Sequence, residues 1–266
     1  MNGKKKLKII ATVEARSGST RLPNKVLKKI EKKSLLEILI GRIKLSKKID
    51  EIVIATTTNP NDLKIVELSK KLKVNYYRGS ELNVLDRLAK ASKKFNADVI
   101  IQLTGDNPLI DHEIIDYMID YFLKHKDKYN YITNNGFGNL QKRKIPLGMD
   151  VQIFFQKDIN FINSLQLIDV YKEHPSLFFY KNKKIKFKKK NIFIPKKWKR
   201  NYFVRLSVDT INDLKFIKII YKKLHKLKPN FSLVDILFFL DTNKDLLNIN
   251  NNVLQNFPDE KNIKKI

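Results

Sequence analysis

Cysteine is absent from this chain of 266 residues, and arginine is scarce, since only eight of its 54 basic residues are arginines. Without cysteine the chain can form no disulfide, and thiolate catalysis and cysteine metal sites are excluded. Long apolar runs are missing too, because no stretch approaches the roughly 20 apolar residues of a membrane-spanning helix. Acidic residues number 27, which leaves a formal net charge of +27. The chemistry of this protein must therefore come from its polar and charged side chains.

The first residues, Met1 to Lys6, resemble the basic start of a signal peptide. The apolar run that follows, Leu7–Val13, is too short for the hydrophobic part of a signal peptide and is followed by Glu14 and Arg16. We therefore expect a cytoplasmic protein without a membrane span. With 42% apolar residues, the chain can bury the core of one large α/β domain.

The net positive charge raises the question of a nucleic-acid partner. Specific nucleic-acid interfaces favour arginine and interleaved aromatic residues on one surface, whereas lysine is abundant throughout this chain. The exception is Lys181–Arg200, a dense basic stretch that contains Phe187, Phe193 and Trp198. It predicts either a solvated hairpin or loop with a few anchoring aromatic residues, or a patch for an anionic substrate or a membrane surface. We expect no nucleic-acid partner.

Short apolar runs alternate with amphipathic segments over about the first 125 residues, the pattern of βαβ units. The strands predicted along the chain are Leu7–Val13, Glu51–Thr57, Asn75–Tyr77, Val99–Leu103, Tyr129–Thr133, Met149–Phe155 and Tyr202–Val208. Apolar residues at helical spacing predict helices between the first four strands. The segment from Leu165 to Arg200 shows no clear pattern, and we expect the polar tail from Leu246 to pack weakly.

Several N-terminal caps predict where helices begin. The capping residues are Thr58-Asn59 followed by Pro60, then Asp111, the pair Thr210 and Asp213, and the pair Ser232 and Asp235. The last two pairs match the capping box, in which each side chain bonds the backbone N–H of the other residue. We expect the helix after Thr210 to end near Leu227.

The segment that follows the first strand has the composition of a phosphate-binding loop. Gly18, set between two serines, permits a sharp bend with a positive φ, and backbone N–H groups in such a bend can face an anion. Arg16, Arg21 and Lys25 add three positive charges. These charges can bind a di- or triphosphate and neutralise the charge that develops as a P–O bond breaks.

Two aspartates stand directly after predicted strands. Asp106 follows Val99–Leu103, and Asp209 follows Tyr202–Val208. Ligands of open α/β sheets bind outside the carboxyl ends of the strands, so both carboxylates are expected at the same rim as the loop. Two carboxylates with phosphate oxygens and water suit Mg²⁺ and nucleotidyl transfer. Each residue has a structural alternative, because Asp106 can be a turn residue before Asn-Pro and Asp209 can simply precede a helix cap.

Several segments in this order resemble the family of spore-coat polysaccharide cytidylyltransferases, which belongs with the CMP-sugar synthetases. The segments are Ala15–Lys25, Ile54–Thr57, Tyr77–Ser80 with Val84–Arg87, Thr104–Leu109 and Val208–Thr210. The resemblance extends over about residues 7–225. It implies a CTP-dependent reaction, in which a sugar hydroxyl or an acid's phosphate attacks the α-phosphate of CTP and pyrophosphate leaves. It also implies Mg²⁺ as the cofactor.

The resemblance implies a set of site residues. The catalytic residues are Arg16, Lys25, Asp106 and Asp209; the nucleotide-binding residues are Ala15, Ser17, Gly18, Ser19, Arg21, Arg78 and Thr104; the acceptor-binding residues are Asp150, Glu173 and His174; and the metal ligands are Asp106 and Asp209. Asp86 and Arg87 also match positions near the nucleoside, although an Asp-Arg pair beside a helical face is equally a surface ion pair. Without the resemblance, a lone Asp150 or His174 is more often structural.

Some positions depart from the family pattern. The family commonly has glycine where this chain has Asn24, and Gly-Lys-Pro-Leu-Leu where it has Lys32–Leu36. Family members often carry aspartate and glutamate where this chain has Leu147 and Gln152. The last two differences remove negative charge near the expected acceptor. They imply either a more anionic acceptor or weaker activity.

We therefore predict an α/β protein with a Rossmann-like three-layer nucleotidyltransferase fold and a mostly parallel mixed sheet. The nucleotidyltransferase domain spans 1–245, with a less regular acceptor and dimerisation insertion at 134–200 and a polar tail at 246–266. The expected function is transfer of CMP from CTP to an acidic sugar or phosphorylated acceptor, by a homodimer, for a surface glycan such as lipopolysaccharide or capsule.

Two alternatives to this function remain open from the sequence. The first is another nucleotidyltransferase or a nucleotide-sugar-dependent glycosyltransferase, because phosphate and metal groups do not select the base. The second is a non-catalytic, basic nucleic-acid-binding protein on the same scaffold. Its binding would weaken steeply with salt and would survive the loss of Asp106, whereas the enzyme would depend on Mg²⁺ and on that residue.

Overall fold

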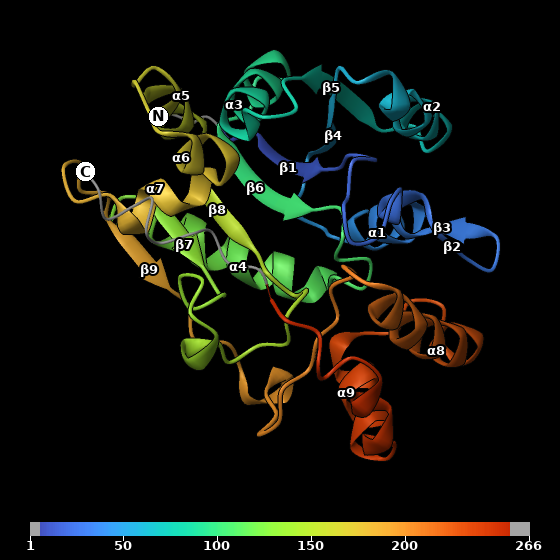
Figure 1. Cartoon of the computed structure of the whole chain (residues 1–266). Coiled ribbons are helices and arrows are strands. Elements are labelled where there is room, and N and C mark those ends of the chain that lie inside the picture. Colours follow the sequence, from blue (N-terminus) through green and yellow to red (C-terminus); the bar gives the residue numbers. More distant parts are fainter. Residues whose placement is uncertain (1–5, 256–266) are drawn as a thin grey trace.

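The computed structural model describes residues 6–255, which form three layers around a central sheet of seven strands (Figure 1). The strands are β1 (Ile9–Glu14), β4 (Glu51–Thr57), β5 (Asn75–Gly79), β6 (Val99–Thr104), β7 (Tyr131–Thr133), β8 (Gln152–Phe155) and β9 (Lys189–Asn191). Their order across the sheet is β5-β4-β1-β6-β8-β7-β9. A separate two-stranded sheet contains β2 (Lys29–Ile30) and β3 (Lys33–Ser34).

Strand β8 makes the sheet a mixed one. It runs antiparallel to both of its neighbours, β6 and β7, whereas β1 is parallel to β4 and β6, β4 to β5, and β7 to β9. The predicted mostly parallel mixed sheet is thus confirmed. Because β1, β4, β5 and β6 end at the same edge, the loops that follow them can together form one site.

Helices cover both faces of the sheet. They are α1 (Leu35–Ile43), α2 (Leu63–Lys71), α3 (Val84–Lys94), α4 (His112–Lys124), α5 (Gln156–Asn163), α6 (Asp169–Glu173), α7 (Pro175–Lys181), α8 (Ile211–Leu227) and α9 (Leu233–Asp241). Short 3-10 helices are η1 (Lys25–Leu27), η2 (Pro60–Asp62), η3 (Leu140–Lys142), η4 (Lys196–Trp198) and η5 (Lys244–Ile249). In the part of the chain that the structure describes, no helix is long and apolar enough to cross a membrane.

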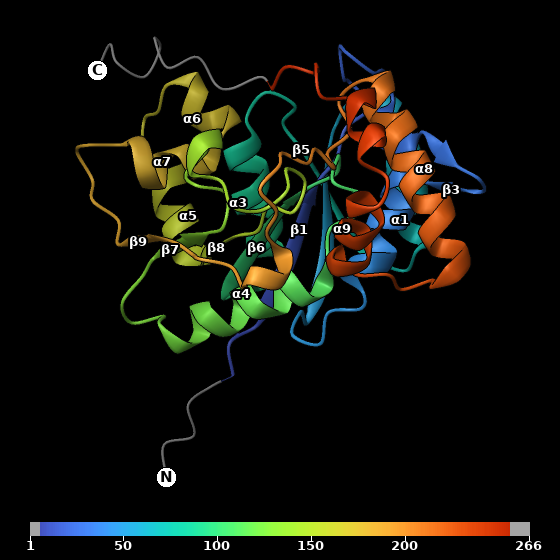
Figure 2. The same cartoon turned by 90° about the horizontal axis from the view of Figure 1, so that it is seen from below.

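The alternation of side chains along β1 separates two hydrophobic cores. Ile9, Ala11 and Val13 pack with residues of α1, α4, α8 and α9, whereas Ile10 packs on the other face with residues of α3, α5, α6 and α7. Figure 2 shows both helix layers, with the strands between them. One hydrophobic core therefore packs against each face of the sheet and supports the strand ends.

Much of the predicted element order is confirmed. Strand β4 has the predicted bounds, and α8 ends at the predicted residue. Asn59, Asp111, Thr210 and Ser232 each accept a hydrogen bond from the backbone of the helix that they precede. Both predicted capping boxes are present. These signals are local, so the sequence alone defines them.

The predicted strand over Tyr202–Val208 is wrong. This segment makes an isolated bridge to Leu147, in which the N–H of Leu206 donates to the Leu147 carbonyl at 2.7 Å. The N–H of Val208 donates to the carbonyl of Asp106 at 2.8 Å. The alternating apolar residues of the segment are buried, so the alternation reflects burial rather than a ladder of strand pairing.

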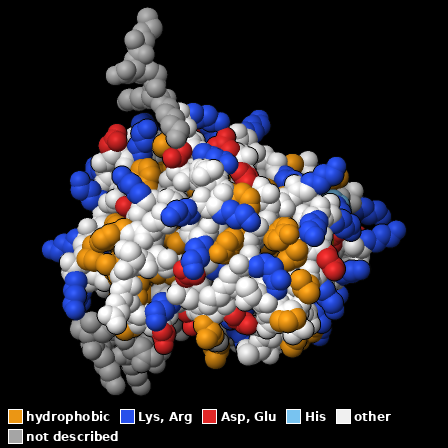
Figure 3. All heavy atoms as spheres, turned by 90° about the horizontal axis from the view of Figure 1, so that it is seen from above, with side chains coloured by type: hydrophobic (Ala, Val, Ile, Leu, Met, Phe, Trp, Pro, Cys, Tyr) orange, Lys and Arg blue, Asp and Glu red, His pale blue; other side chains and the backbone are white. Residues whose placement is uncertain are grey.

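The segment 134–200 is more regular than the sequence indicates. It supplies β8 and β9 to the central sheet and forms α5, α6 and α7. Within its basic stretch, Trp198 is buried and Phe187 packs against the core, while Phe193 is 70% exposed. These contacts favour the loop with anchoring aromatic residues. On the face drawn in Figure 3, Lys and Arg side chains are spread among neutral and hydrophobic ones.

The expected weak packing of the tail is wrong for its first residues. Leu246, Leu247 and Ile249, all within η5, pack against the larger core, and Asn250 is only 3% exposed. The apolar side chains in this asparagine-rich stretch are the reason, because they fall on the side that meets α8 and α9. The rest of the predicted tail, residues 256–266, lies outside the described residues.

Candidate active site

The carboxyl ends of β1 and β6 lie side by side, and a polar loop follows each. Glu14 pairs in register with Thr104. The N–H of Gly105 donates to the carbonyl of Glu14 at 2.8 Å, and a Cβ added to Gly105 would lie 2.9 Å from the same oxygen. Glycine at this position therefore lets the loop that carries Asp106 approach the loop after β1.

Buried Asp62 fixes the start of the loop after β1. The backbone N–H of Ser17 donates to one carboxylate oxygen of Asp62 at 2.7 Å, and the Thr57 hydroxyl donates to the other at 2.5 Å. Burial alone would raise the pKa of Asp62, but the hydrogen bonds from Ser17 and Thr57 bring it below its ordinary value. The N–H of Ser17 is thus bound to the carboxylate of Asp62 rather than free for the phosphate that the sequence suggested.

Asn24, rather than Gly18, has the left-handed backbone in this loop. Asn24 has φ 55° and ψ 29°, whereas Gly18 has no positive φ, so the predicted left-handed backbone at Gly18 is wrong. The chain still turns there, because the N–H of Ser19 donates to the carbonyl of Ser17 at 2.8 Å. Asparagine adopts the left-handed region more readily than most residues, and glycine does so most easily. This geometry accounts for the asparagine at a position where the family has glycine. Gly18 has a different role, because a Cβ there would lie 2.9 Å from the Glu81 carboxylate.

Lys25 joins the two predicted carboxylates. Its Nζ lies 2.8 Å from Asp106 Oδ2 and 2.8 Å from Asp209 Oδ1. Burial alone would lower the pKa of Lys25, but the charges of Asp106 and Asp209 outweigh burial and raise it. The structure thus brings together three predicted catalytic residues from three distant segments of the chain.

Asp209 contacts two further cations. Arg21 Nη2 lies 3.1 Å from Oδ1, and Arg205 Nη2 donates to Oδ2 at 2.5 Å. Arg205 also donates through Nε to Asp213 at 2.9 Å, and both of these side chains are buried. We call this set of six side chains the paired charge cluster: Arg21, Lys25, Asp106, Arg205, Asp209 and Asp213.

The carboxylate of Asp106 is held in the same way. The Thr104 hydroxyl donates to Asp106 Oδ1 at 2.7 Å, and the side-chain amide of Asn107 donates to that hydroxyl at 2.8 Å. Burial would raise the pKa of Asp106, but the ion pair with Lys25 and the hydrogen bonds from Lys25 and Thr104 lower it. A simple turn residue needs none of these contacts, so Asp106 does more than terminate a turn before Asn107 and Pro108.

A second group of predicted residues surrounds Arg16. Its guanidinium lies 3.6 Å from the carboxylate of Glu81. Burial lowers the pKa of His174, and the charge of Arg16 lowers it further, while Glu173 acts in the opposite direction. The predicted acceptor residue His174 is therefore close enough to both Glu173 and Arg16 for their charges to shift its pKa.

Two predicted arginines near the nucleoside position contact backbone instead of carboxylates. The guanidinium of Arg78 donates to the carbonyls of residues 57–59 at 2.7–3.2 Å, and so supports the turn after β4. Arg87 is only 3% exposed and donates to the carbonyl of Ser80. The surface ion-pair alternative does not describe Arg87, but it does describe Asp86, which bonds Lys90 one helical turn away at 2.9 Å.

The predicted acceptor residue Asp150 belongs to a separate set of contacts. Arg143 binds both of its carboxylate oxygens, one of them at 2.9 Å. Burial raises the pKa of the Tyr180 phenol, and the nearby charge of Asp150 raises it further. All three residues come from segment 134–200, and the Asp150 carboxylate already has a cationic partner within it.

Sequence patterns assign no role to Glu14, at the end of β1. Gln102 Nε2 donates to Glu14 Oε1 at 2.6 Å, and Gln102 itself is buried with its Oε1 unpaired. Burial raises the pKa of Glu14 to about 7, Arg87 and Gln102 oppose this rise, and Asp106 adds to it. A carboxyl group that titrates near neutral pH thus lies beside the paired charge cluster.

Other residues of the site also escaped prediction. Arg205 occurs in a segment of buried apolar residues, and a charge in such a segment was the available signal. Asp213 was recognised only as a helix cap. Asn250 donates to the carbonyl of Arg205 at 3.2 Å and to Asp213 Oδ1 at 2.9 Å, and no sequence pattern indicates this long-range contact.

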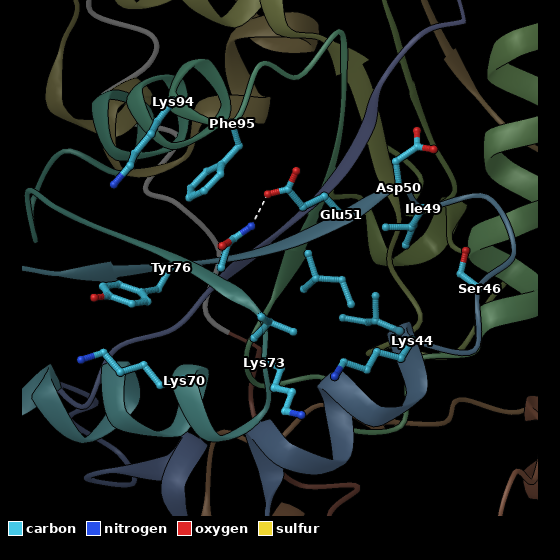
Figure 4. Close-up of a pocket in the computed structure, with 14 residues that line it drawn as sticks. Lys44, Ser46, Ile49, Asp50, Glu51, Lys70, Lys73, Tyr76, Lys94 and Phe95 are labelled. Carbon is cyan, nitrogen blue, oxygen red and sulfur yellow. Dashed lines mark hydrogen bonds between the residues drawn. The ribbon is translucent and has the colours of Figure 1, made fainter.

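The opposite edge of the sheet carries a hollow of about 710 Å³ (Figure 4). It is lined by the first residues of β4 and β5 and by the ends of α1, α2 and α3. Lys44, Lys70, Lys73 and Lys94 lie around it, but no predicted site residue does. We call it the far-edge hollow.

The chemistry of Asp106 and Asp209 fits Mg²⁺ only in part. Their carboxylates already converge on one cation, Lys25 Nζ, and carboxylate oxygens are the ligands that Mg²⁺ prefers. Within residues 6–255, no group of three or more His, Asp and Glu side chains is placed to hold a metal ion. The two carboxylates therefore suit an ion whose other ligands come from phosphate and water.

The fold and the site together define this protein as a nucleotidyltransferase with a Rossmann-like fold. The solved structure of a cytidylyltransferase from Leptospira borgpetersenii matches it with a TM-score of 0.84. The two chains are 30% identical, and the match covers 94% of this chain and all of the other.

Sequence comparisons give the family. A family model of cytidylyltransferases matches residues 10–249, and the chain belongs to this family. An uncharacterized protein of Methanocaldococcus jannaschii is 39% identical over 249 residues, which cover 94% of this chain and 97% of that protein. The spore coat polysaccharide biosynthesis protein SpsF of Bacillus subtilis is 33% identical over 244 residues, 89% of this chain and 95% of SpsF. The family resemblance read from the motifs is thereby confirmed.

Proposed function

We propose that this protein transfers CMP from CTP to an acidic sugar or a phosphorylated acceptor, with Mg²⁺ as cofactor and pyrophosphate as the second product. The observation that carries the proposal is the convergence of Lys25, Asp106 and Asp209 at the carboxyl edge of the sheet, in a chain of the cytidylyltransferase family. The relationship to SpsF, a spore coat polysaccharide biosynthesis protein, supports a product used for a surface polysaccharide. Its use for lipopolysaccharide or capsule is part of the proposal.

The loop after β1 would bind the triphosphate of CTP. Arg16, Arg21 and Lys25 are its three cations, and Arg21 and Lys25 are partly exposed. Charge-assisted hydrogen bonds from these groups would neutralise the leaving pyrophosphate. The remaining nucleotide contacts in the proposal come from Ala15, Ser17, Gly18, Ser19, Arg78 and Thr104.

Asp106 and Asp209 would hold Mg²⁺, which when bound offsets the charge of the phosphates and lowers the pKa of an acceptor hydroxyl. Thr104 orients the carboxylate of Asp106, and Arg205 orients that of Asp209. No side-chain nucleophile is needed, because positioning and charge neutralisation supply most of the catalysis in phosphoryl and nucleotidyl transfer.

The acceptor would bind between the loop after β1 and segment 134–200. His174 is near Arg16 and Glu173, and Asp150 is fixed by Arg143 on the same segment. An anionic acceptor suits a site in which the carboxylates already have cationic partners. A homodimer formed through this segment is part of the proposal.

The experiment is an assay of pyrophosphate release with Mg²⁺ from CTP, UTP, ATP and GTP, each with a panel of ulosonic acids and sugar phosphates. We expect release from CTP with one acceptor class. Asp106→Asn should reduce it at least about a hundredfold, since loss of one electrostatic stabiliser costs about 10²–10³ in kcat. Asp169→Asn is the control, because the Asp169 side chain is 98% exposed. Release that is equal in Asp106→Asn, or a protein that binds no nucleotide, would contradict the proposal.

A further inference from the structure

We propose that Lys25 is an internal counter-ion of Asp106 and Asp209. It prevents free divalent ions from binding these two carboxylates until the triphosphate of CTP binds Lys25 instead. This inference rests on the proposed function and adds an order of binding to it. In the structure, one ammonium group binds both carboxylates that would hold the metal, at 2.8 Å each.

Lys25 and a metal ion would compete for the same oxygens. Mg²⁺ binds carboxylate oxygens at about 2.0–2.1 Å. An ion bound to both Asp106 Oδ2 and Asp209 Oδ1 would lie in the space that Lys25 Nζ occupies between them. Two cations cannot share that space, because their repulsion rises steeply at such short separations. Lys25 must therefore leave these oxygens before an ion can bridge them.

The charges of the paired charge cluster support this order. Its three cations and three carboxylates sum to zero, so the cluster presents no net charge to a free divalent ion. If phosphate oxygens bind Lys25 and Arg21, one cation and three carboxylates remain, which is a net charge of −2. That charge matches one divalent ion. The triphosphate would thus create the negative site into which its own metal ion fits.

The cations of the cluster differ in how firmly they are held. Arg205 is 1% exposed and is bonded to Asp209, Asp213 and Gln255. Lys25 and Arg21 are 16% and 33% exposed, and both are on the loop after β1. Lysine is a flexible point charge that exchanges partners easily, whereas the planar guanidinium of Arg205 is fixed in its fork of bonds. Lys25, because it is flexible, and Arg21, because it is more exposed than Arg205, can therefore move to the phosphates. Arg205 keeps Asp209 in place.

The test measures binding of Mn²⁺ alone, without nucleotide, from the electron paramagnetic resonance signal of free Mn²⁺. The proteins compared are wild type, Lys25→Met, Lys25→Arg and the exposed neighbour Lys28→Met as a matched control. We expect Lys25→Met to bind Mn²⁺ at least about tenfold more tightly than wild type, a change of about 1.4 kcal/mol. Lys25→Arg and Lys28→Met should bind like wild type. Adding Asp106→Asn to Lys25→Met should abolish the gain.

Equal Mn²⁺ affinity in wild type and Lys25→Met would overturn the inference, and so would the absence of binding in both. If Lys25→Met does not fold, wild type decides: its Mn²⁺ affinity must rise at least about tenfold when CTP is added, and CTP affinity must rise by the same factor with Mn²⁺. A constant affinity would overturn the inference. Failure of the protein to bind CTP would instead reject the proposed function, while the nucleotide-free comparison would still decide the role of Lys25.

Discussion

The two edges of the central sheet carry positive charge in different ways. At the carboxyl edge, each cation of the paired charge cluster lies within 3.1 Å of a carboxylate. At the far-edge hollow, Lys44 donates to a backbone carbonyl, and Lys70, Lys73 and Lys94 form no ion pair with a carboxylate of residues 6–255 (Figure 4). In this lysine-rich chain, the pairing of cations with carboxylates therefore indicates a candidate site better than the number of cations does.

The largest effect should come from the most deeply buried pair of the cluster. Asp213→Ala leaves the buried guanidinium of Arg205 without one of its two carboxylates. We expect the free energy of unfolding to fall by about 3–5 kcal/mol, because a buried ion pair loses one partner and α8 loses its capping box. Urea unfolding measures this change.

Asp169→Ala is the control for Asp213→Ala. Asp169 pairs with Lys172 on the surface and should change the free energy of unfolding by about 0.5 kcal/mol or less. A similar loss in the two variants would mean that the cluster is held no more firmly than a surface ion pair.

Glu14, at the carboxyl edge of the sheet, should make the free energy of unfolding depend on pH. Its pKa rises from 4.5 to about 7 in the folded protein, so the folded state binds the proton more tightly than the unfolded state does. Stability from Glu14 is therefore fully present below pH 4.5 and is lost as pH rises through about 7. Relative to Glu14→Gln, wild type should lose about 1–3 kcal/mol of unfolding free energy over this range.

The measurement is urea unfolding of wild type and Glu14→Gln between pH 4.5 and 8. The difference between the two proteins isolates Glu14 from other titrating groups. Lys70→Gln, at the far-edge hollow, provides the comparison, since it should show no such pH-dependent difference. A constant offset between wild type and Glu14→Gln would contradict the assignment.

Asn250 tests how far the cluster depends on the end of the described chain. Asn250→Ala removes the donor that binds the Arg205 carbonyl and Asp213. We expect a loss of about 1–2 kcal/mol, because buried acceptors lose a hydrogen bond. The exposed neighbour Asn251→Ala should have little effect in the same denaturation assay. Equal effects would show that the tail packs loosely, as the sequence first suggested.

The sequence predicts the parts of the site that depend on local pattern. Gly18, Lys25 and Asp106 occur in motifs directly after predicted strands, so their position at the carboxyl edge follows from the βα order. Contacts between distant segments bring together Arg205, Asp213 and Asn250. The spacing of residues within one segment does not predict such contacts. For the same reason, Tyr202–Val208 reads as a strand, although its neighbours leave it only an isolated bridge.

Glycine patterns show another limit of sequence reading. Gly18 suggests a left-handed bend, but the bend is at Asn24, and Gly18 is small because Glu81 approaches it. A glycine in the sequence shows where the backbone can adopt a positive φ. Only the packed structure shows whether a positive φ or a close neighbour is the reason for the glycine.

We expect the paired charge cluster, and not the lysine-rich surface, to bind CTP. Isothermal titration of CTP with Mg²⁺ should compare wild type, Lys25→Met and the triple variant Lys70→Ala, Lys73→Ala, Lys94→Ala. We predict that Lys25→Met weakens CTP binding about 10–100-fold, the loss expected for a charged hydrogen bond, while the triple variant stays within about twofold of wild type. A triple variant that loses CTP binding while Lys25→Met keeps it would contradict the account.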